Sequence, residues 1–348
     1  MKIGQFFFIS FEGTEANKTL LSFLNKIKPG GIIFFTRNII TPGQIYELIK
    51  KIVKELDYCP FLGIDLEGGK VNRFKNIFPL LPSFSDLGKI KNHKIVQKHA
   101  ELSAKAMKIF GFNVNFSPVV DLDFGNRNGL ETRTFGRKPE LVTSLAEIYL
   151  QTFKYFKILT TLKHFPGLGR AELDTHFRLP TIDISFSELE KEDLLPFKKL
   201  KNMASFIMIN HAHYTCFETE ILPSSLSTNV IQNLLKHKLN YEGVIITDDL
   251  AMKAIEKYEN APLRAFTAGA DMILLCDQPS EIEKNFQKFK NEYYRQKISE
   301  NRLKQSFQRI NRIKSFVDFP PDFFDSQIIN SLSREFENHY NQVKKYSV

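Results

Sequence analysis

Short apolar runs alternate with longer amphipathic stretches along most of this chain. In the stretch 139–158, for example, Val142, Leu145, Tyr149 and Phe153 fall on one face at helical spacing. The runs themselves are short and nearly continuous in apolar residues, which is typical of strands buried on both faces of a parallel sheet. We interpret eight runs as strands: residues 4–11, 31–35, 61–66, 114–122, 160–165, 205–211, 243–248 and 272–276.

This regular alternation predicts an α/β protein in which eight parallel strands close into a (β/α)8 barrel, the TIM-barrel architecture. A doubly wound open sheet is the alternative, but no G-x-G-x-x-G pattern follows the first strand. We expect residues 1–316 to form a single barrel domain. Residues 317–348 are expected to form a C-terminal helical tail packed on the barrel, with a helix at 325–343.

Polar side chains stand at the ends of five consecutive predicted strands. In a barrel these ends meet at one rim, where active sites are built. An Asp after a strand can instead be the N-cap of the next helix, but capping does not account for the lysine and the histidines. The residues concerned are Asp65, Asp121, Asp123, Lys163, His164, His211, Asp248 and Asp249.

The segment 163–176 is the most informative part of the chain. It begins with Lys163 and His164 at a strand end and passes through Pro166 and two glycines, which continue neither strand nor helix. It ends with an acid and an imidazole two residues apart, Asp174 and His176. This composition predicts a catalytic loop that carries a proton-transfer group over a fixed pocket.

Composition limits the possible classes of protein. The 348 residues carry a net charge of +9, but the basic residues are spread along the chain. We therefore interpret them as a solvated surface and expect no nucleic-acid partner. No segment reaches the ~18 apolar residues of a membrane span, so no membrane partner is expected. Three widely spaced cysteines imply neither a disulfide framework nor a zinc cluster, which favours the cytoplasm.

Several segments, in this order and spacing, resemble the bacterial family 3 glycoside hydrolases, specifically the single-domain β-N-acetylglucosaminidases of cell-wall recycling. The resemblance runs from Gly4 to about Arg312. Each segment alone is moderately specific, whereas their order and spacing together are a strong signal. The segments are residues 31–38, 64–74, 115–121, 133–136, 163–176, 244–252 and 268–276.

The resemblance implies that Asp248 is the nucleophile and that His176, oriented by Asp174, is the general acid and base. The chemistry fits these roles, because a carboxylate at a strand end can attack an anomeric carbon. An imidazole has a reference pKa of ~6.5, suited to giving and then taking a proton. The alternatives are that Asp248 caps the following helix and that His176 is an ordinary exposed loop residue.

The resemblance also implies which residues hold the sugar. The matching positions are Asp65, Arg73, Arg133, Lys163 and His164, with His211 in the pocket wall. A His-x-His pair at a strand end, here at residues 211 and 213, ligates metal in some barrel hydrolases. The first strand offers no further ligand, so we expect no metal and no organic cofactor.

We therefore expect a retaining exo-β-N-acetylglucosaminidase that acts on muropeptide fragments. Its expected partner is a small carbohydrate, and we expect a monomer in the cytoplasm. A glycoside phosphorylase on the same scaffold and a non-catalytic sugar-binding protein remain open. The chain departs from the family at Leu168, where histidine is common, and at Arg170-Ala171, where a small acidic or hydroxyl pair is usual. These departures bear on loop closure and on substrate choice.

Overall fold

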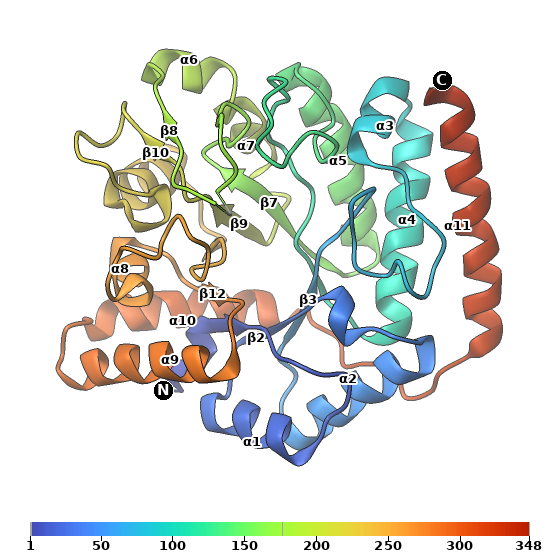
Figure 1. The fold of residues 1–348 in the computed structure, drawn as a ribbon, viewed down its shortest axis with the longest axis horizontal. Helices are drawn as coiled ribbons and strands as arrows, with labels where there is room; N and C mark the ends of the chain where they lie inside the picture. Colours follow the sequence, from blue (N-terminus) through green and yellow to red (C-terminus); the bar gives the residue numbers. More distant parts are fainter. Residues whose placement is uncertain (1, 176, 348) are drawn as a thin grey trace.

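The computed structural model describes residues 2–175 and 177–347 and shows a (β/α)8 barrel (Figure 1). Eight parallel strands pair in the order β11-β9-β7-β6-β3-β2-β1-β12. The two end strands of this order approach through a parallel bridge between Ile246 and Met272, which closes the sheet. The barrel strands are β1 (Phe7–Ile9), β2 (Gly31–Phe34), β3 (Phe61–Ile64), β6 (Val114–Asn115), β7 (Leu159–Phe165), β9 (Phe206–Ile209), β11 (Val244–Thr247) and β12 (Ile273–Leu275).

Each barrel strand is followed by helical structure on the outside, as the alternating pattern predicted. None of the helices in the described part of the chain is long and apolar enough to cross a bilayer.

The helices are α1 (Lys18–Ile27), α2 (Pro42–Leu56), α3 (Phe84–Ile90), α4 (His93–Phe110), α5 (Pro139–Tyr155), α6 (Phe186–Lys191), α7 (Leu194–Leu200), the π-helix η4 (Asn229–Lys238), α8 (Ala261–Ala268), α9 (Pro279–Tyr294), α10 (Glu300–Lys314) and α11 (Ser326–Ser347).

Seven of the eight predicted strands are shorter than expected, and two of them are shortened most. The first begins only at Phe7, because Ile3–Phe6 forms a 3₁₀ turn (η1) in which Gly4 lies against the backbone of Ile27. The strand predicted at 114–122 is regular only over Val114–Asn115. Pro118 interrupts it, because proline has no amide hydrogen to donate to a ladder. Pairing resumes in a bridge between Val119 and Lys163.

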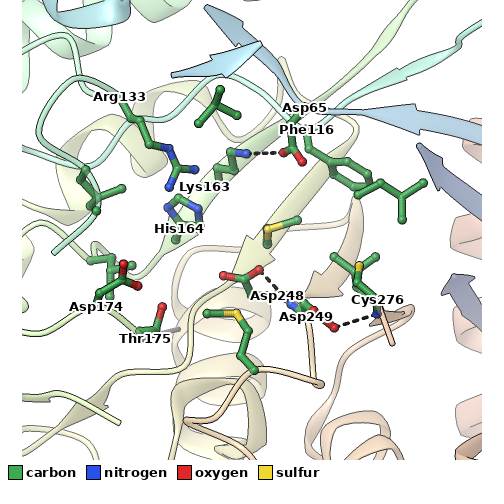
Figure 2. A pocket seen from close by; sticks show the side chains of 18 of the residues that line it. Asp65, Phe116, Arg133, Lys163, His164, Asp174, Thr175, Asp248, Asp249 and Cys276 are labelled. Atoms are coloured by element: carbon green, nitrogen blue, oxygen red, sulfur yellow. Dashed lines mark hydrogen bonds and ion pairs between the residues drawn. The ribbon is translucent and has the colours of Figure 1, made fainter. Parts of the chain in front are cut away.

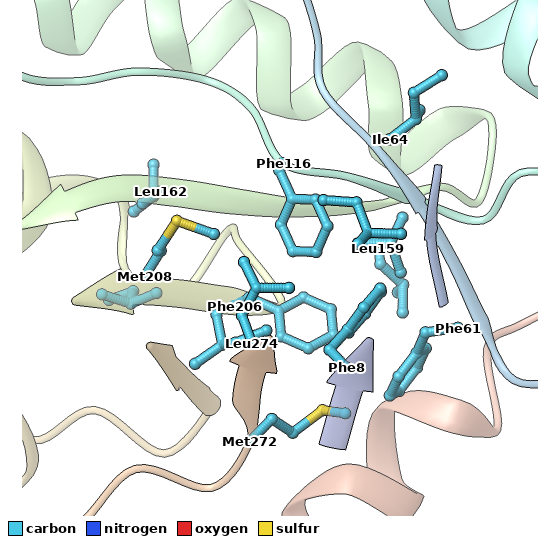
Figure 3. Close-up of a cluster of buried hydrophobic side chains, with 14 of the residues drawn as sticks. Phe8, Phe61, Ile64, Phe116, Leu159, Leu162, Phe206, Met208, Met272 and Leu274 are labelled. Atoms are coloured by element: carbon cyan, nitrogen blue, oxygen red, sulfur yellow. The ribbon is translucent and has the colours of Figure 1, made fainter. Parts of the chain in front are cut away.

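Aromatic rings fill the barrel interior (Figure 3). The ring centroid of Phe8 lies 5.0 Å from that of Phe116, and those of Phe61 and Phe206 are 5.3 Å apart. Glycine on the neighbouring strands makes room for Phe8, since a Cβ at Gly31 would lie 2.4 Å from its ring. The interior of the barrel is therefore a packed core, and the open space lies at the carboxyl ends of the strands.

The helix predicted at 325–343 is α11 (Ser326–Ser347), and it runs along α4 on the outside of the barrel (Figure 1). Phe336 of α11 stacks on Phe78 with ring centroids 4.8 Å apart. His339 lies against His99 of α4, with 5.8 Å between ring centroids. The last helix thus covers the region that supports one wall of the site described next.

Candidate active site

A cavity of about 350 Å³ opens at the carboxyl ends of the barrel strands (Figure 2). Most of the residues predicted from the sequence contribute to its lining: Asp65, Arg73, Arg133, Lys163, His164, Asp174 and Asp248. His176 lies outside the described residues. The barrel thus gathers around one hollow a set of side chains that are as much as 183 residues apart in the sequence (65 to 248).

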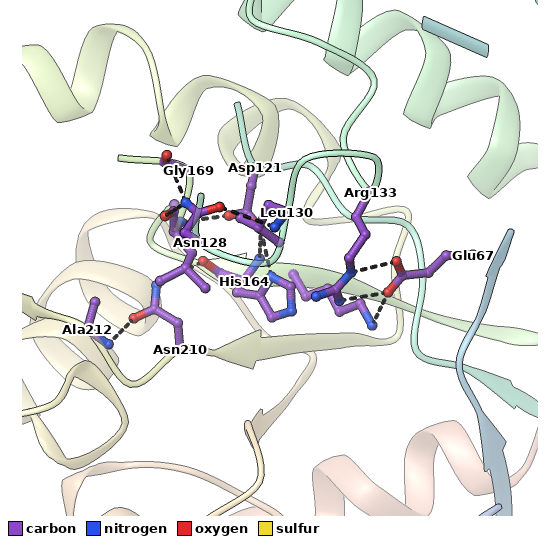
Figure 4. Close-up of polar contacts among 12 residues, drawn as sticks. Glu67, Asp121, Asn128, Leu130, Arg133, His164, Gly169, Asn210 and Ala212 are labelled. Carbon is purple, nitrogen blue, oxygen red and sulfur yellow. Dashed lines mark hydrogen bonds and ion pairs between the residues drawn. The ribbon is translucent and has the colours of Figure 1, made fainter. Parts of the chain in front are cut away.

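One wall of the cavity is a network of buried ion pairs. Lys163, at 2% exposure, donates from Nζ to Asp65 Oδ1 at 2.8 Å and lies 2.7 Å from Glu67 Oε1. Arg133 binds Glu67 through two bonds, from Nε at 2.8 Å and from Nη2 at 2.9 Å (Figure 4). Such paired, charge-assisted bonds fix the side chains of different loops in one geometry.

The network keeps its acids ionised. Burial by itself raises the pKa of Asp65, but the Lys163 ammonium and the Arg73 guanidinium outweigh burial and hold that pKa well below its usual range. The pKa of Glu67 is lowered in the same way, by Arg133 and Lys163 against burial. Asp65, which lines the cavity, is therefore available as a hydrogen-bond acceptor for hydroxyl groups of a ligand, whereas Glu67 lies behind it and holds Lys163 and Arg133 in place.

Arg73 stands at the mouth of the cavity. Its Nη2 lies 3.4 Å from Asp65 Oδ2, and its guanidinium lies 5.2 Å from the ring centroid of Phe35. Among the described residues its Nε has no hydrogen-bond partner although it is buried. A buried donor without a partner is costly, and a polar ligand in the cavity would satisfy it.

His164 is held by a buried acid behind the cavity. Its Nδ1 lies 2.6 Å from Asp121 Oδ2, and its backbone amide donates to the same oxygen at 3.1 Å. Asp121 Oδ1 also accepts from the amide of Leu168 at 2.7 Å. One fully buried carboxylate therefore orients the imidazole and fixes the start of the loop after β7.

Two adjacent acids follow β11, and the structure gives them different surroundings. Asp249 Oδ1 accepts from the amides of Ala251 at 3.0 Å and Cys276 at 2.8 Å, so this carboxylate organises the local backbone. The Asp248 carboxylate points into the cavity and accepts from the amide of Asp249 at 2.8 Å (Figure 2).

The protonation of the two acids differs as well. Burial raises the pKa of Asp249 to about 6, and its two backbone bonds offset only part of that effect. Burial also acts on Asp248, but the nearby imidazoles of His164 and His211 outweigh it and lower the pKa of Asp248. Both carboxyl groups are therefore ionised at neutral pH, and as the pH falls Asp249 takes up a proton before Asp248 does.

The loop after β7 brings Asp174 and Thr175 to the edge of the same cavity (Figure 2). Gly129 faces Asp174 closely, because a Cβ at this residue would lie 2.9 Å from Asp174 Oδ2. Gly129 also has a φ of +84°, which glycine adopts without strain. A carboxylate on this loop thus approaches the hollow from the side, while Asp248 rises from a strand end.

His211 is fully buried beside Asp249 and is not among the residues that line the cavity. Its Nε2 lies 2.9 Å from the carbonyl of Asp249 and its Nδ1 lies 2.8 Å from Ser225 Oγ. His213 has a different partner, with Nδ1 3.4 Å from the carbonyl of Leu222. In the part of the chain that is described, no cluster of His, Cys, Asp or Glu has the arrangement of a metal site.

Sequence reasoning did not assign a role to Glu67 or to Asp121. Glu67 connects Lys163 with Arg133, and Asp121 orients His164. A signal existed for Asp121, which stands at a predicted strand end. Glu67 lies two residues after Asp65 within a matched segment, but its partners come from distant loops and cannot be deduced from spacing.

A closed parallel barrel with a charged cavity at the carboxyl ends of its strands defines an enzyme of the (β/α)8 class. Residues 1–313 match the glycosyl hydrolase family 3 N-terminal domain. The chain therefore belongs to glycosyl hydrolase family 3 and is a glycoside hydrolase, which confirms the resemblance seen in its motifs.

Relatives and solved structures agree with this assignment. A protein of Nitrosospira multiformis named beta-hexosaminidase is 32% identical over 285 residues, which cover 79% of this chain and 81% of the relative. A family 3 β-N-acetylglucosaminidase from Paenibacillus sp. has a TM-score of 0.90 at 29% identity, over 97% of this chain and 68% of that one. NagZ from Neisseria gonorrhoeae, solved with N-trifluoroacetyl-D-glucosamine, has a TM-score of 0.80 at 25% identity, over 99% and 98% of the two chains.

Proposed function

We propose that the protein is a retaining exo-β-N-acetylglucosaminidase that removes terminal β-linked N-acetylglucosamine from cell-wall muropeptide fragments. The observation that carries this proposal is the state of Asp248. It is an ionised carboxylate at a strand end, directed into a cavity whose side wall bears a second acid, Asp174.

In the proposed reaction Asp248 attacks the anomeric carbon while His176 protonates the departing glycosidic oxygen. The carbon–oxygen bond to the aglycone breaks as the bond to Asp248 forms, which gives a covalent glycosyl-enzyme. His176, now neutral, removes a proton from water, which displaces Asp248 and releases the sugar. Two inversions at one carbon retain the β configuration, and Asp174 holds the imidazole in the orientation needed.

The ion-pair wall supports a role in binding the sugar. Asp65 supplies an ionised acceptor, and Lys163, Arg133 and Arg73 supply donors. The cavity volume of about 350 Å³ lies at the low end for ligand pockets, about 300–1,000 Å³. This size favours one terminal sugar in the hollow and therefore exo action.

The substrate class rests on likeness to the relatives named beta-hexosaminidase and to the NagZ complex with a 2-acylamino sugar. The three cysteines are free, which agrees with action in the reducing cytoplasm. One chain supplies both Asp248 and the loop with Asp174, so a single protomer is the proposed catalytic unit.

The test is a panel of 4-nitrophenyl β-glycosides assayed with the purified protein: N-acetylglucosaminide, glucoside, xyloside and N-acetylgalactosaminide. We expect the N-acetylglucosaminide to give the highest kcat/KM, at least about 100-fold above the glucoside. A pocket built to hydrogen-bond a substituent rejects analogues that lack it by large factors. Equal rates on the glucoside and the N-acetylglucosaminide would contradict the proposed specificity.

The same assay separates the alternatives. Proton NMR of the first product should show the β anomer of the free sugar, and addition of phosphate should not change the product. Sugar 1-phosphate as the main product would establish a phosphorylase instead. Saturable binding of N-acetylglucosamine without release of nitrophenol would establish a non-catalytic sugar-binding protein.

A further inference from the structure

The first half of the loop after β7 is fastened to its surroundings by hydrogen bonds. Asn128 Nδ2 donates to the carbonyls of Gly169 at 3.1 Å and Ala171 at 2.9 Å. On the other side, Tyr214 donates from its hydroxyl to the carbonyl of Gly167 at 2.7 Å. Ala171 is fully buried, so the chain is held in place up to this residue.

Arg170 adds a charged anchor at the end of this fastened stretch. Its Nε donates to Asp193 Oδ2 at 2.8 Å, and its Nη2 donates to Glu192 Oε2 at 2.6 Å. The Asp193 side chain is fully buried, and its second oxygen has no hydrogen-bond partner among the described residues. A buried carboxylate without a cation is strongly disfavoured, so Arg170 and Asp193 depend on each other.

An aromatic ring extends the anchor to the neighbouring loop. The Arg170 guanidinium lies 4.2 Å from the ring centroid of Phe124, and that of Arg137 lies 3.9 Å from the same centroid. Both guanidinium groups therefore pack against the same ring. Arg137 Nη2 also donates to Glu192 Oε2 at 2.7 Å. The loop that carries Arg170, the loop that carries Phe124 and Arg137, and the turn at Glu192 and Asp193 are thereby joined at one point outside the cavity.

The loop changes character directly after this anchor. Glu172 is exposed, Leu173 is 49% exposed and Phe177 is 69% exposed. Asp174 and Thr175 lie in this second half, at the edge of the cavity. The anchored stretch thus ends at Ala171, and the residues after it alternate between exposed side chains and the buried Thr175.

We propose that Arg170 is a positioning residue, which fixes the base of the loop and thereby the place of Asp174 at the edge of the cavity. This inference rests on the proposed function, in which Asp174 orients the proton donor. Asp174 follows the anchored stretch by only three residues, so a displaced loop base would shift its carboxylate relative to the cavity. Arg170 itself does not line the cavity and acts through the loop backbone.

The experiment compares Arg170→Ala with Arg170→Lys and with Arg295→Ala, a matched control whose ion pair to Glu292 lies on an exposed helix end. We expect Arg170→Ala to lower kcat on the aryl N-acetylglucosaminide by about 10–100-fold, because small misplacement of a catalytic group has effects of this size. KM should change by less than about threefold, since the binding wall is untouched. Arg170→Lys, which keeps one ion pair, should recover part of kcat, and Arg295→Ala should match the wild type.

Hydrogen–deuterium exchange of peptides that cover residues 164–178 gives a second readout, independent of activity. Arg170→Ala should exchange faster at residues 166–171, with the barrel strands unchanged. Glu192→Gln, at a partly exposed residue, should show the same change to a smaller extent if Arg170→Ala does not fold. Unchanged kcat or unchanged exchange at 166–171 would overturn the inference. If the wild type cleaves no N-acetylglucosaminide, the proposed function fails, whereas the exchange comparison still tests the anchor.

Discussion

The two sides of the cavity differ in how their charges are held. On the binding wall, Lys163 lies within 2.8 Å of two carboxylates, and Arg133 grips Glu67 with two bonds. On the side of β11, Asp248 forms no ion pair with any described residue and accepts one hydrogen bond from the amide of Asp249. The side chains of the binding wall are therefore held by direct ion pairs, whereas the Asp248 carboxylate is not.

In the proposed function, this difference separates the residues that hold a substrate from the residue that reacts with it. Direct ion pairs orient the binding groups before a ligand arrives, so little ordering remains to be done on binding. A direct ion pair on Asp248 would instead occupy the oxygen that has to attack. The more distant imidazoles of His164 and His211, and Lys163, outweigh burial and lower the pKa of Asp248 without blocking it.

The largest effect on activity is expected from removing the Asp248 carboxylate. Asp248→Ala should lower kcat on the aryl N-acetylglucosaminide by about 10⁴-fold or more, as expected for loss of a nucleophile. Thermal unfolding should stay close to that of the wild type, because the Asp248 side chain accepts only one hydrogen bond from the described residues, that of the Asp249 amide. Asp322→Ala, at an exposed residue, is the matched control. Added azide should restore part of the rate and yield the α-glycosyl azide. More than a few per cent residual activity without azide would remove Asp248 from the proposed role.

On the binding wall, by contrast, removing a charge should lower the free energy of unfolding. Glu67→Gln keeps the shape of the side chain but leaves two buried cations short of a partner. Breaking a buried pair in this way costs about 3–5 kcal/mol. Urea unfolding followed by circular dichroism measures the loss. Glu281→Gln, which breaks an exposed pair with Lys284, should cost less than about 1 kcal/mol. Equal losses in the two variants would contradict the contrast between wall and surface.

A smaller effect should appear behind the binding wall as a dependence on pH. His99 Nε2 lies 3.1 Å from the carbonyl of Glu67, and His339 of α11 packs on His99. Burial lowers the pKa of His99 to about 3 and that of His339 to about 4; His339 adds to the first effect and Lys98 to the second. Both imidazoles are therefore neutral when folded, whereas the unfolded chain takes up protons below about pH 6.5.

The contribution of these two imidazoles to the free energy of unfolding should thus be constant above about pH 6.5 and fall as the pH drops from there toward 4. His339→Phe removes one of the two groups. Between pH 7.5 and pH 5 the wild type should lose about 2 kcal/mol more free energy of unfolding than this variant. Urea titrations at both pH values provide the measurement. Parallel losses in both proteins would show that His339 does not titrate in this range.

The alternation of apolar runs and amphipathic stretches was enough to predict the barrel, since all eight strands lie within or overlap the runs at residues 4–276. The lengths of two strands differed most from the prediction, for different reasons. Pro118 is a local signal against a regular strand at 114–122, whereas the turn at Ile3–Phe6 depends on contact between Gly4 and Ile27, which the sequence does not show. Local propensity yields to tertiary contact at such places.

The sequence of this chain was sufficient to locate the strand ends, and the carboxyl ends of barrel strands meet at one rim. Asp65, Lys163, His164 and Asp248 could therefore be assigned to one site from the sequence. The division of labour between Asp248 and Asp249 depends on which carboxylate meets the amides of Ala251 and Cys276, a fact of folded geometry. The same holds for Glu67 and Arg170, whose partners lie far away along the chain. The sequence shows which ionisable side chains stand at the strand ends. Their pKa values and orientations depend on burial and on neighbouring side chains, which come together only when the barrel has folded.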